Sequence, residues 1–378
     1  MNTHRYTFSF ILILVVLQTN LIQSQTTLPK PDHIVICILE NHGFNQIIGS
    51  PAAPYINSLS NDTLSALFTA SYGITHPSQP NYLALFSGDT QGVTDDLVPT
   101  ENPFNTPNLG GQLIGIGNTF IMYSEDLPSV GFNGISSGKY ARKHNPSANW
   151  MGNGINQISP TTNQPFSAFP TSDFTLLPTV SFVCPNTIDD MHDGANPATI
   201  TNGDNWISTN LDHYIQWAKA NNSLFILTFD EDNGSSSNQI ATIFTGQMVL
   251  AGQYATKITH YSVLHTIEEM YGLPIIGDST TNAPIRYSWK QKVNIVPDSV
   301  TITDGKIYPN PAKELLYIEL NDYQNATIEI FNLKGQLMLV NPLDSKNTEL
   351  NITNLRSGYY LVKINQKEGL LVKRFIKI

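Results

Sequence analysis

The sequence predicts an α/β domain with a mostly parallel central sheet flanked by helices, followed by a small all-β sandwich module. Between residues 30 and 290, apolar β-rich runs alternate with helical segments. These runs are almost continuously apolar, which is typical of parallel strands that are buried on both faces. After residue 305, shorter strands with alternating polarity are separated by turn residues at intervals of about 8–12 residues, which indicates a β-sandwich.

The predicted elements of the first domain follow one another in order. We expect strands at 33–39, 66–71, 119–123, 179–184, 224–229 and 240–250. Helices are expected around 82–86, at 206–220 and at 261–271. The segment 131–173 is rich in Gly, Ser, Asn and Pro and predicts irregular loop, a kind of structure that often carries function.

The remaining parts of the chain have other signatures. Residues 1–24 are expected to be a signal peptide, because a basic start precedes an apolar run at 8–17 that is too short for the ~20 residues of a membrane span. The catalytic domain is placed at 30–290, a linker at 291–304 and the β-module at 305–378. Strands of the module are expected at 315–320, 327–332, 336–340, 349–352, 359–365 and 370–378. The protein is therefore predicted to be exported.

The charge of the chain is divided unevenly. Of 378 residues, 20 are basic and 30 acidic, which gives a formal charge of −10. Residues 304–378 hold ten basic and eight acidic side chains, so residues 1–303 carry −12 and all nine His. An acidic domain without basic runs is a poor electrostatic partner for a polyanion, so nucleic acid is not expected as a partner.

Polar side chains follow four of the predicted strands at the point where each ends. In open α/β sheets, the carboxyl ends of parallel strands line the binding crevice. Clustered carboxylates would repel one another without a cation, and such oxygen ligands suit hard divalent metals, whereas His admits transition metals. Helix capping and turns also place Asp at strand ends, and this alternative stays open. The residues are Glu40, Asn41, Glu125, Asp190, His192, Asp230 and Glu231.

A candidate nucleophile lies in the segment THPSQPNY at 75–82. Ser78, with Pro80 two residues later, is typical of a helix entrance, where free N–H groups and the helix dipole favour a phosphate. The alternative is an ordinary Ser at a helix N-cap.

Seven ordered motifs resemble one family. They are ENHGF at 40–44, HPSQPNY at 76–82, YSED at 123–126, YARKHNP at 140–146, DDMHDG at 189–194, FDEDNG at 229–234 and THYSVL at 259–264. Together they resemble the phosphoesterase family that joins secreted acid phosphatases and bacterial phospholipases C, within the alkaline phosphatase superfamily. The resemblance covers roughly residues 30–275 and implies an alkaline phosphatase-like fold.

The resemblance also implies roles for single residues. Glu40, Asn41, Asp230 and Glu231 would hold a divalent metal (Mg²⁺, Ca²⁺, Mn²⁺ or Zn²⁺), and Ser78 would accept the phosphoryl group. Asn81 would donate to the oxyanion. His192 and His260 would contact phosphate oxygens and protonate the leaving alkoxide. The pocket wall is expected to include His76, His144, Glu125 and Asp190.

The tail has a second resemblance. The segments IYPNP at 307–311, IEIFN at 328–332, LRSGYYL at 355–361 and KRFIKI at 373–378 resemble a type IX secretion C-terminal sorting domain. This implies export through the type IX machinery, which would be a partner of the module.

The leading hypothesis is a secreted, metal-dependent phosphomonoesterase that acts through a phosphoserine at Ser78. A phospholipase C-type phosphodiesterase is the runner-up, so the substrate would be a small phosphoester or a phospholipid headgroup. From another class, an inactive surface adhesin on the same fold stays open. Intact Ser78, Asp230 and Glu231 count against that last alternative.

Overall fold

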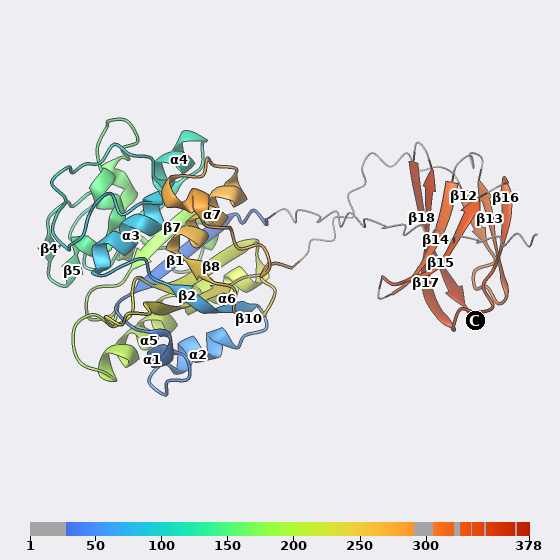
Figure 1. The fold of residues 1–378 in the computed structure, drawn as a ribbon, viewed down its shortest axis with the longest axis horizontal. Helices are drawn as coiled ribbons and strands as arrows, with labels where there is room; N and C mark the ends of the chain where they lie inside the picture. The colour runs from blue at the N-terminus through green and yellow to red at the C-terminus, as the bar shows by residue number, and fades with distance from the viewer. Residues whose placement is uncertain (1–27, 291–304, 321–325, 334, 344, 367–368) are drawn as a thin grey trace, which may run out of the picture. The chain divides into compact units, whose positions relative to one another are not determined.

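The computed structural model describes residues 28–290, 305–320, 326–333, 335–343, 345–366 and 369–378 (Figure 1). The predicted signal peptide at 1–24 and the predicted linker at 291–304 lie outside the described residues. The chain divides into two compact units between Gln291 and Lys292, and each unit is described by itself. No helix in the described part of the chain is long and apolar enough to cross a membrane.

A nine-stranded sheet forms the centre of the first unit, in the order β10-β2-β9-β8-β1-β7-β3-β6, with β11 also paired to β2. All neighbours pair in parallel except β9, which runs antiparallel to β2 and β8. The prediction of a mostly parallel sheet is confirmed. The strands are β1 (His33–Leu39), β2 (Ser65–Tyr72), β3 (Phe120–Ser124), β6 (Asn163–Pro165), β7 (Val180–Cys184), β8 (Ser223–Phe229), β9 (Gln239–Thr245), β10 (Gly252–Tyr254) and β11 (Ile258–Thr259).

The central strand β1 shows why its sequence is continuously apolar. Ile34, Ile36 and Ile38 belong to one core cluster, and the alternate residues Val35 and Cys37 belong to another on the opposite face. Because successive side chains of a strand point to opposite faces, a strand covered on both sides needs apolar residues at every position.

Helices cover both faces of the sheet (Figure 1). On the face of Ile36 lie α3 (Ser78–Ser87), α4 (Leu109–Gly115) and α7 (His260–Tyr271). The other face is covered by α1 (Phe44–Ile47), α2 (Pro54–Ser60), α5 (Ala198–Asn210) and α6 (Asp212–Ala220).

Two predicted elements differ from the structure. The helix expected at 206–220 is two helices, α5 and α6, which meet at Leu211. The first half of α5 is rich in Thr, Asn and Gly, which are weak helix formers, so burial of its apolar side chains decides its conformation. The strand expected at 240–250 ends at Thr245, where the Gly246 backbone N–H turns to the carbonyl of Leu64.

The loop expected at 131–173 is mostly irregular, as predicted. It holds short 3₁₀ turns and a small hairpin of β4 (Ser136–Ser137) and β5 (Tyr140–Ala141). The 3₁₀ turn η1 (Arg142–His144) follows this hairpin directly.

The second unit has two antiparallel sheets over one aliphatic core, which confirms the predicted β-sandwich class. One sheet has the order β12-β13-β16 and the other β15-β14-β17-β18. The strands are β12 (Gly305–Tyr308), β13 (Leu315–Leu320), β14 (Ala326–Asn332), β15 (Leu337–Leu343), β16 (Asn347–Asn351), β17 (Gly358–Gln366) and β18 (Gly369–Lys377).

Candidate active site

The parallel register of β1 and β8 brings two acidic segments together. Leu39 lies opposite Phe229 in the ladder, so Glu40 and Asp230 leave the same edge of the sheet side by side. The Asp230 N–H donates to the Leu39 carbonyl at 3.0 Å, and the Asn41 N–H donates to Asp230 Oδ1 at 3.0 Å. Asn41 has a φ of 50°, a left-handed conformation that Asn tolerates better than most residues.

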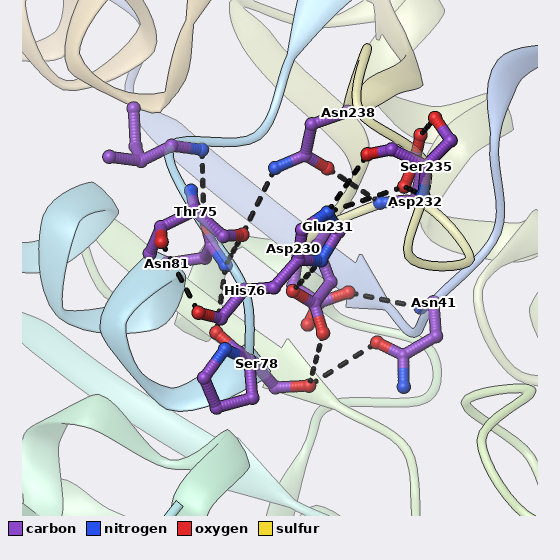
Figure 2. Close-up of polar contacts among 12 residues, drawn as sticks. Asn41, Thr75, His76, Ser78, Asn81, Asp230, Glu231, Asp232, Ser235 and Asn238 are labelled. Atoms are coloured by element: carbon purple, nitrogen blue, oxygen red, sulfur yellow. Dashed lines mark hydrogen bonds and ion pairs between the residues drawn. The ribbon is translucent and has the colours of Figure 1, made fainter. Parts of the chain in front are cut away.

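Ser78 occupies the first position of α3 and faces this edge (Figure 2). Its hydroxyl oxygen lies 2.9 Å from Glu40 Oε2 and 3.3 Å from Glu231 Oε1. The Asn41 amide also lies 3.2 Å from this hydroxyl, and its contacts are satisfied when the amide nitrogen donates to Ser78, Glu40 and Glu231. Ser78 can donate its one hydrogen to only one of the two carboxylate oxygens.

The carboxylates of this cluster are withdrawn from water. Glu40, Asp230 and Glu231 are 0%, 1% and 5% exposed. Burial, with the neighbouring charges of Asp230 and Asp190, raises the pKa of Glu40 well above its ordinary value. Burial also raises the pKa of Asp230, and burial together with Asp230 raises the pKa of Glu231 to about 7. Such a set fits a divalent cation, which would offset the mutual repulsion of the ionised groups.

A second donor set adjoins the first through Glu40. Ligand atoms of Glu40, His144 and His192 all lie within 4.8 Å of one another. His144 Nδ1 is 3.0 Å from Asp190 Oδ2 and its Nε2 is 3.3 Å from Glu40 Oε1. Despite these distances, His144 Nε2 and Asp190 Oδ2 are buried without a hydrogen-bond partner. Buried polar atoms are rarely left unpaired. The unpaired His144 nitrogen and Asp190 oxygen therefore fit the ligand set of a metal ion.

Glu231 also holds a histidine. His76 Nδ1 lies 2.5 Å from Glu231 Oε2, and the side chain of His76 is 36% exposed. Figure 2 shows His76 on the loop before Ser78, next to the segment of Glu231 and Asp232. The structure therefore brings His76, Ser78 and Glu231 into one connected group.

His192 stands at the open side of the cluster. Its ring is 29% exposed, and its Nδ1 lies 2.9 Å from Asp193 Oδ1. The other ring nitrogen, Nε2, is 3.2 Å from Lys143 Nζ. The Asp193 carboxylate therefore fixes one nitrogen of the imidazole and leaves the other to face the site.

Lys143 is a site residue that the sequence reasoning missed. Its ammonium lies 2.9 Å from Asp96 Oδ2, and Asp96 Oδ1 accepts the Gln79 N–H of the first turn of α3 at 3.0 Å. Burial alone would lower the pKa of Lys143, but Asp96, Glu40 and Asp230 raise it above its ordinary value. The site thus contains a permanent cation. Its position directly before His144, inside the motif at 140–146, was the available signal.

Asn81 is placed differently from its expected role. Its amide nitrogen donates to the Thr75 carbonyl at 2.8 Å and the Pro77 carbonyl at 3.1 Å. Its Oδ1 accepts the N–H groups of Ile74 and Thr75. Both amide hydrogens are therefore used inside the loop, and these contacts favour positioning of the segment before Ser78 over donation to an oxyanion.

His260 and Glu125 are also engaged elsewhere. His260 Nε2 lies 2.6 Å from the Asp230 carbonyl oxygen, and burial lowers the pKa of this His to about 4. It therefore supports the backbone of Asp230. Both Glu125 oxygens are taken, by the Asn186 N–H at 3.0 Å and the Trp206 indole N–H at 2.9 Å. Glu125 thus joins the end of β3 to α5, and these contacts do not bring it to Ser78.

Comparisons with known proteins relate both units of the chain to described families. The family model described as "Phosphoesterase family" matches residues 50–274, and the model described as "Secretion system C-terminal sorting domain" matches residues 306–378. A phosphatidylinositol-3-phosphatase of Mycobacterium tuberculosis is 47% identical over 265 residues, which are 70% of this chain and 85% of that protein. An acid phosphatase of Aspergillus fumigatus is 32% identical over 65% of this chain and 58% of its own length. A solved structure from Vibrio parahaemolyticus, described as a protein in the alkaline phosphatase superfamily, is 15% identical and aligns with a TM-score of 0.49 over 85% of this chain and 84% of its own.

Proposed function

Because the chain belongs to the phosphoesterase family and is a hydrolase of phosphoester bonds, we propose that it is an exported, metal-dependent phosphomonoesterase that forms a phosphoserine at Ser78. One observation carries the proposal. The Ser78 hydroxyl, at a helix N-terminus, contacts the buried carboxylates of Glu40 and Glu231 and the half-buried amide of Asn41. A serine hydroxyl is a weak nucleophile at neutral pH, and this surrounding would activate it.

The metal would be held by Glu40, Asn41, Asp230 and Glu231, whose oxygens fit a hard divalent cation. When bound, the cation lowers the pKa of the serine hydroxyl and neutralises phosphate charge. His144 and His192 beside Glu40 would also admit a transition metal such as Zn²⁺.

The nucleophilic step uses groups already in contact. Ser78 Oγ forms the new bond to phosphorus, and its proton passes to a carboxylate oxygen that contacts it, nearest of which is Glu40 Oε2 at 2.9 Å. Glu231 is held in place by His76 on its other oxygen. Catalysis of phosphoryl transfer depends almost entirely on in-line positioning of this oxygen and on stabilisation of the charge on phosphate.

Lys143 and His192 would act on the phosphate and the leaving oxygen. The ammonium of Lys143 neutralises charge on the phosphate oxygens, which compensates for the scarcity of other cations around Ser78. His192 would donate a proton from Nε2 to the leaving alkoxide as its bond to phosphorus breaks, after the Lys143 ammonium has moved from this nitrogen to the phosphate oxygens. In the second half, the same nitrogen would take a proton from water, which attacks the phosphoserine. As the bond between phosphorus and Ser78 Oγ breaks, the proton held by Glu40 would return to Oγ, which releases phosphate and restores Ser78.

Phosphorylated inositol is a second substrate to include. The relative of 47% identity is named a phosphatidylinositol-3-phosphatase, and its match spans 70% of this chain. A phosphate on an inositol ring is a monoester, so it would need no change in the chemistry at Ser78.

The C-terminal sorting domain indicates secretion or surface export. We infer that residues 1–24 act as a cleaved signal peptide for a first membrane crossing and that the type IX machinery recognises the module at 305–378. Mass spectrometry of the exported protein would test this, because an intact N-terminus at Met1 would contradict cleavage.

Hydrolysis of p-nitrophenyl phosphate by the wild type and by Ser78→Ala, with and without a strong chelator, tests the proposed chemistry. We expect turnover only in the wild type, with loss on chelation and recovery when divalent metal is added back. Full activity of Ser78→Ala would exclude this nucleophile, and indifference to the chelator would count against the metal. Release of phosphocholine from phosphatidylcholine in place of monoester hydrolysis would favour a phospholipase C.

A further inference from the structure

A small cavity lies beside the first turn of α3 and has no place in the reaction as described so far. Its volume is about 190 Å³. Its wall includes Gln79, which follows Ser78 directly, and Lys143, whose ammonium contacts His192. The cavity is therefore next to both the proposed nucleophile and the proposed acid.

Several polar groups of this wall are already paired with protein atoms. Gln79 Nε2 donates to the carbonyls of Asp95 at 3.0 Å and Leu97 at 2.6 Å. The ammonium of Lys143 is paired with the carboxylate of Asp96. Arg142 is only 2% exposed; its Nε donates to Asn133 Oδ1 at 2.9 Å and its Nη2 to the Ala148 carbonyl at 3.1 Å, while its Nη1 is buried without a hydrogen-bond partner.

The rest of the wall is aliphatic apart from Ser136. Val98, Ile135 and Ala141 line the cavity, from the loop after α3 and from the β4–β5 hairpin. Ile135 is 73% exposed and Val98 is 36% exposed. Two exposed aliphatic side chains from separate segments thus line one cavity, together with Gln79 and Lys143.

We propose that this cavity binds the apolar carbon skeleton of the leaving alcohol. This inference rests on the proposed function. In-line displacement puts the leaving oxygen opposite Ser78 Oγ, where His192 can protonate it, and the cavity adjoins that side through Lys143. Contact with Val98 and Ile135 removes apolar surface from water on both partners and favours binding.

The size of the cavity limits the class of alcohol. Pockets for drug-sized ligands are about 300–1,000 Å³, so a smaller cavity suits one aromatic ring or a short alkyl chain. Monoesters of phenols and short aliphatic alcohols are therefore favoured over monoesters of glycerol.

Two substrates and neutral substitutions test this subsite. The double variant Val98→Asn/Ile135→Asn removes the aliphatic contacts without adding a charge that would repel every phosphate. We expect its KM for phenyl phosphate to rise about tenfold, the effect of losing a small apolar contact, while its kcat stays within about twofold. Its kinetic constants for glycerol 2-phosphate should change less than about twofold.

The matched control is Ile155→Asn, because Ile155 is 79% exposed and does not line the cavity. It should leave both substrates unchanged, and retained turnover of glycerol 2-phosphate shows that the double variant is folded. Equal changes for the two substrates, or no change for either, would overturn the subsite while the proposed function stands. Failure of the wild type to hydrolyse either ester would overturn the proposed function, and the subsite with it.

Discussion

The two units of the chain bury their polar groups very differently. In the described part of the C-terminal module, Lys377 is the only charged or polar residue among the buried ones, and the core is aliphatic and aromatic. In the first unit, Glu40, Asp190, Asp230 and His144 are all at most 2% exposed, and they lie at the edge of the sheet beside Ser78.

This difference separates stability from chemistry. Burying an ionised group costs free energy unless it is paired, so a module that only has to fold avoids it. The strand β13 alternates buried and half-buried residues, whereas every residue of β8 is buried and the next two are acidic. The catalytic unit therefore places buried charge where a metal and a phosphate would offset the cost.

Replacing one buried carboxylate of the first unit should have the largest effect on activity. Asp230→Asn keeps the size of the side chain but removes its charge, and we expect kcat/KM to fall at least ~10³-fold, about 4 kcal/mol of transition-state stabilisation. Steady-state hydrolysis of p-nitrophenyl phosphate with metal in excess measures it.

Asp204→Asn is the matched control for Asp230. Asp204 is 1% exposed, like Asp230, but it accepts the N–H groups of Tyr55 and Ile56 at the start of α2. Its replacement should lower stability and change kcat/KM by less than about threefold. An equal loss of activity in both variants would show that any buried charge in this unit affects turnover. It would contradict a specific catalytic role for the charge at Asp230.

A core truncation in the module should give the opposite pattern. Phe375 is 0% exposed and packs against Tyr360, so Phe375→Ala is expected to destabilise the module by about 3–5 kcal/mol. Turnover of p-nitrophenyl phosphate should persist after the module has melted, because all proposed catalytic residues lie within 28–290. Scanning calorimetry and activity on one sample check this, and joint loss of both would contradict the division.

The positive charge in the site gives a smaller effect. Lys143→Met should lower kcat/KM about 10²-fold, as expected when one group that stabilises transition-state charge is removed. Lys143→Arg should recover part of the loss, which a purely structural role would not predict. Lys219→Met is the control. Lys219 lies on α6, 2.7 Å from Asp62, and its replacement should leave kcat/KM unchanged. Full activity of Lys143→Met would remove this residue from the mechanism.

The smallest effect concerns a buried acid outside the site. Burial raises the pKa of Glu268 to about 7, although the Ser279 hydroxyl and the Ile276 N–H donate to its oxygens. The folded state therefore favours the protonated acid. Its contribution to stability is complete below the ordinary pKa of 4.5 and is lost as the pH rises through about 7.

Denaturant titrations at several pH values test this expectation. From about pH 5 to about pH 8, the wild type should lose about 1–2 kcal/mol of unfolding free energy relative to Glu268→Gln. Glu101→Gln, at an exposed position, should follow the wild type. Parallel curves for wild type and Glu268→Gln would show that the carboxyl does not titrate in this range.

The sequence predicted the features that depend on neighbouring residues and strand ends. Continuous apolar runs predicted β1 and β8, and the polar residues that follow them were predicted to gather at one edge of the sheet. The family resemblance placed Ser78 at this edge, and in the structure Glu40, Asn41 and Glu231 contact it. The roles expected for these residues in metal binding and nucleophilic attack stay predictions. The α5 helix was missed in part, because its stability comes from tertiary packing and not from local propensity.

The rest of the site depends on contacts between distant loops, which no local pattern reveals. The net negative charge of the domain gave no reason to expect a cation in the site, so Lys143 was missed. Its pairing with Asp96 joins segments that are far apart in the sequence. Asn81 was expected to donate to the substrate, but the same amide satisfies the loop at 74–77. In both cases, the hydrogen-bond partners of the side chain come from segments that only the fold brings together.

Trapping the phosphorylated protein during turnover tests the central claim most directly. The wild type, mixed with excess p-nitrophenyl phosphate and quenched in acid, should carry one phosphate on the peptide that contains Ser78. Ser78→Ala treated in the same way should carry none. Phosphate on His192 or on any residue other than Ser78, or turnover by Ser78→Ala at the wild-type rate, would contradict the phosphoserine mechanism.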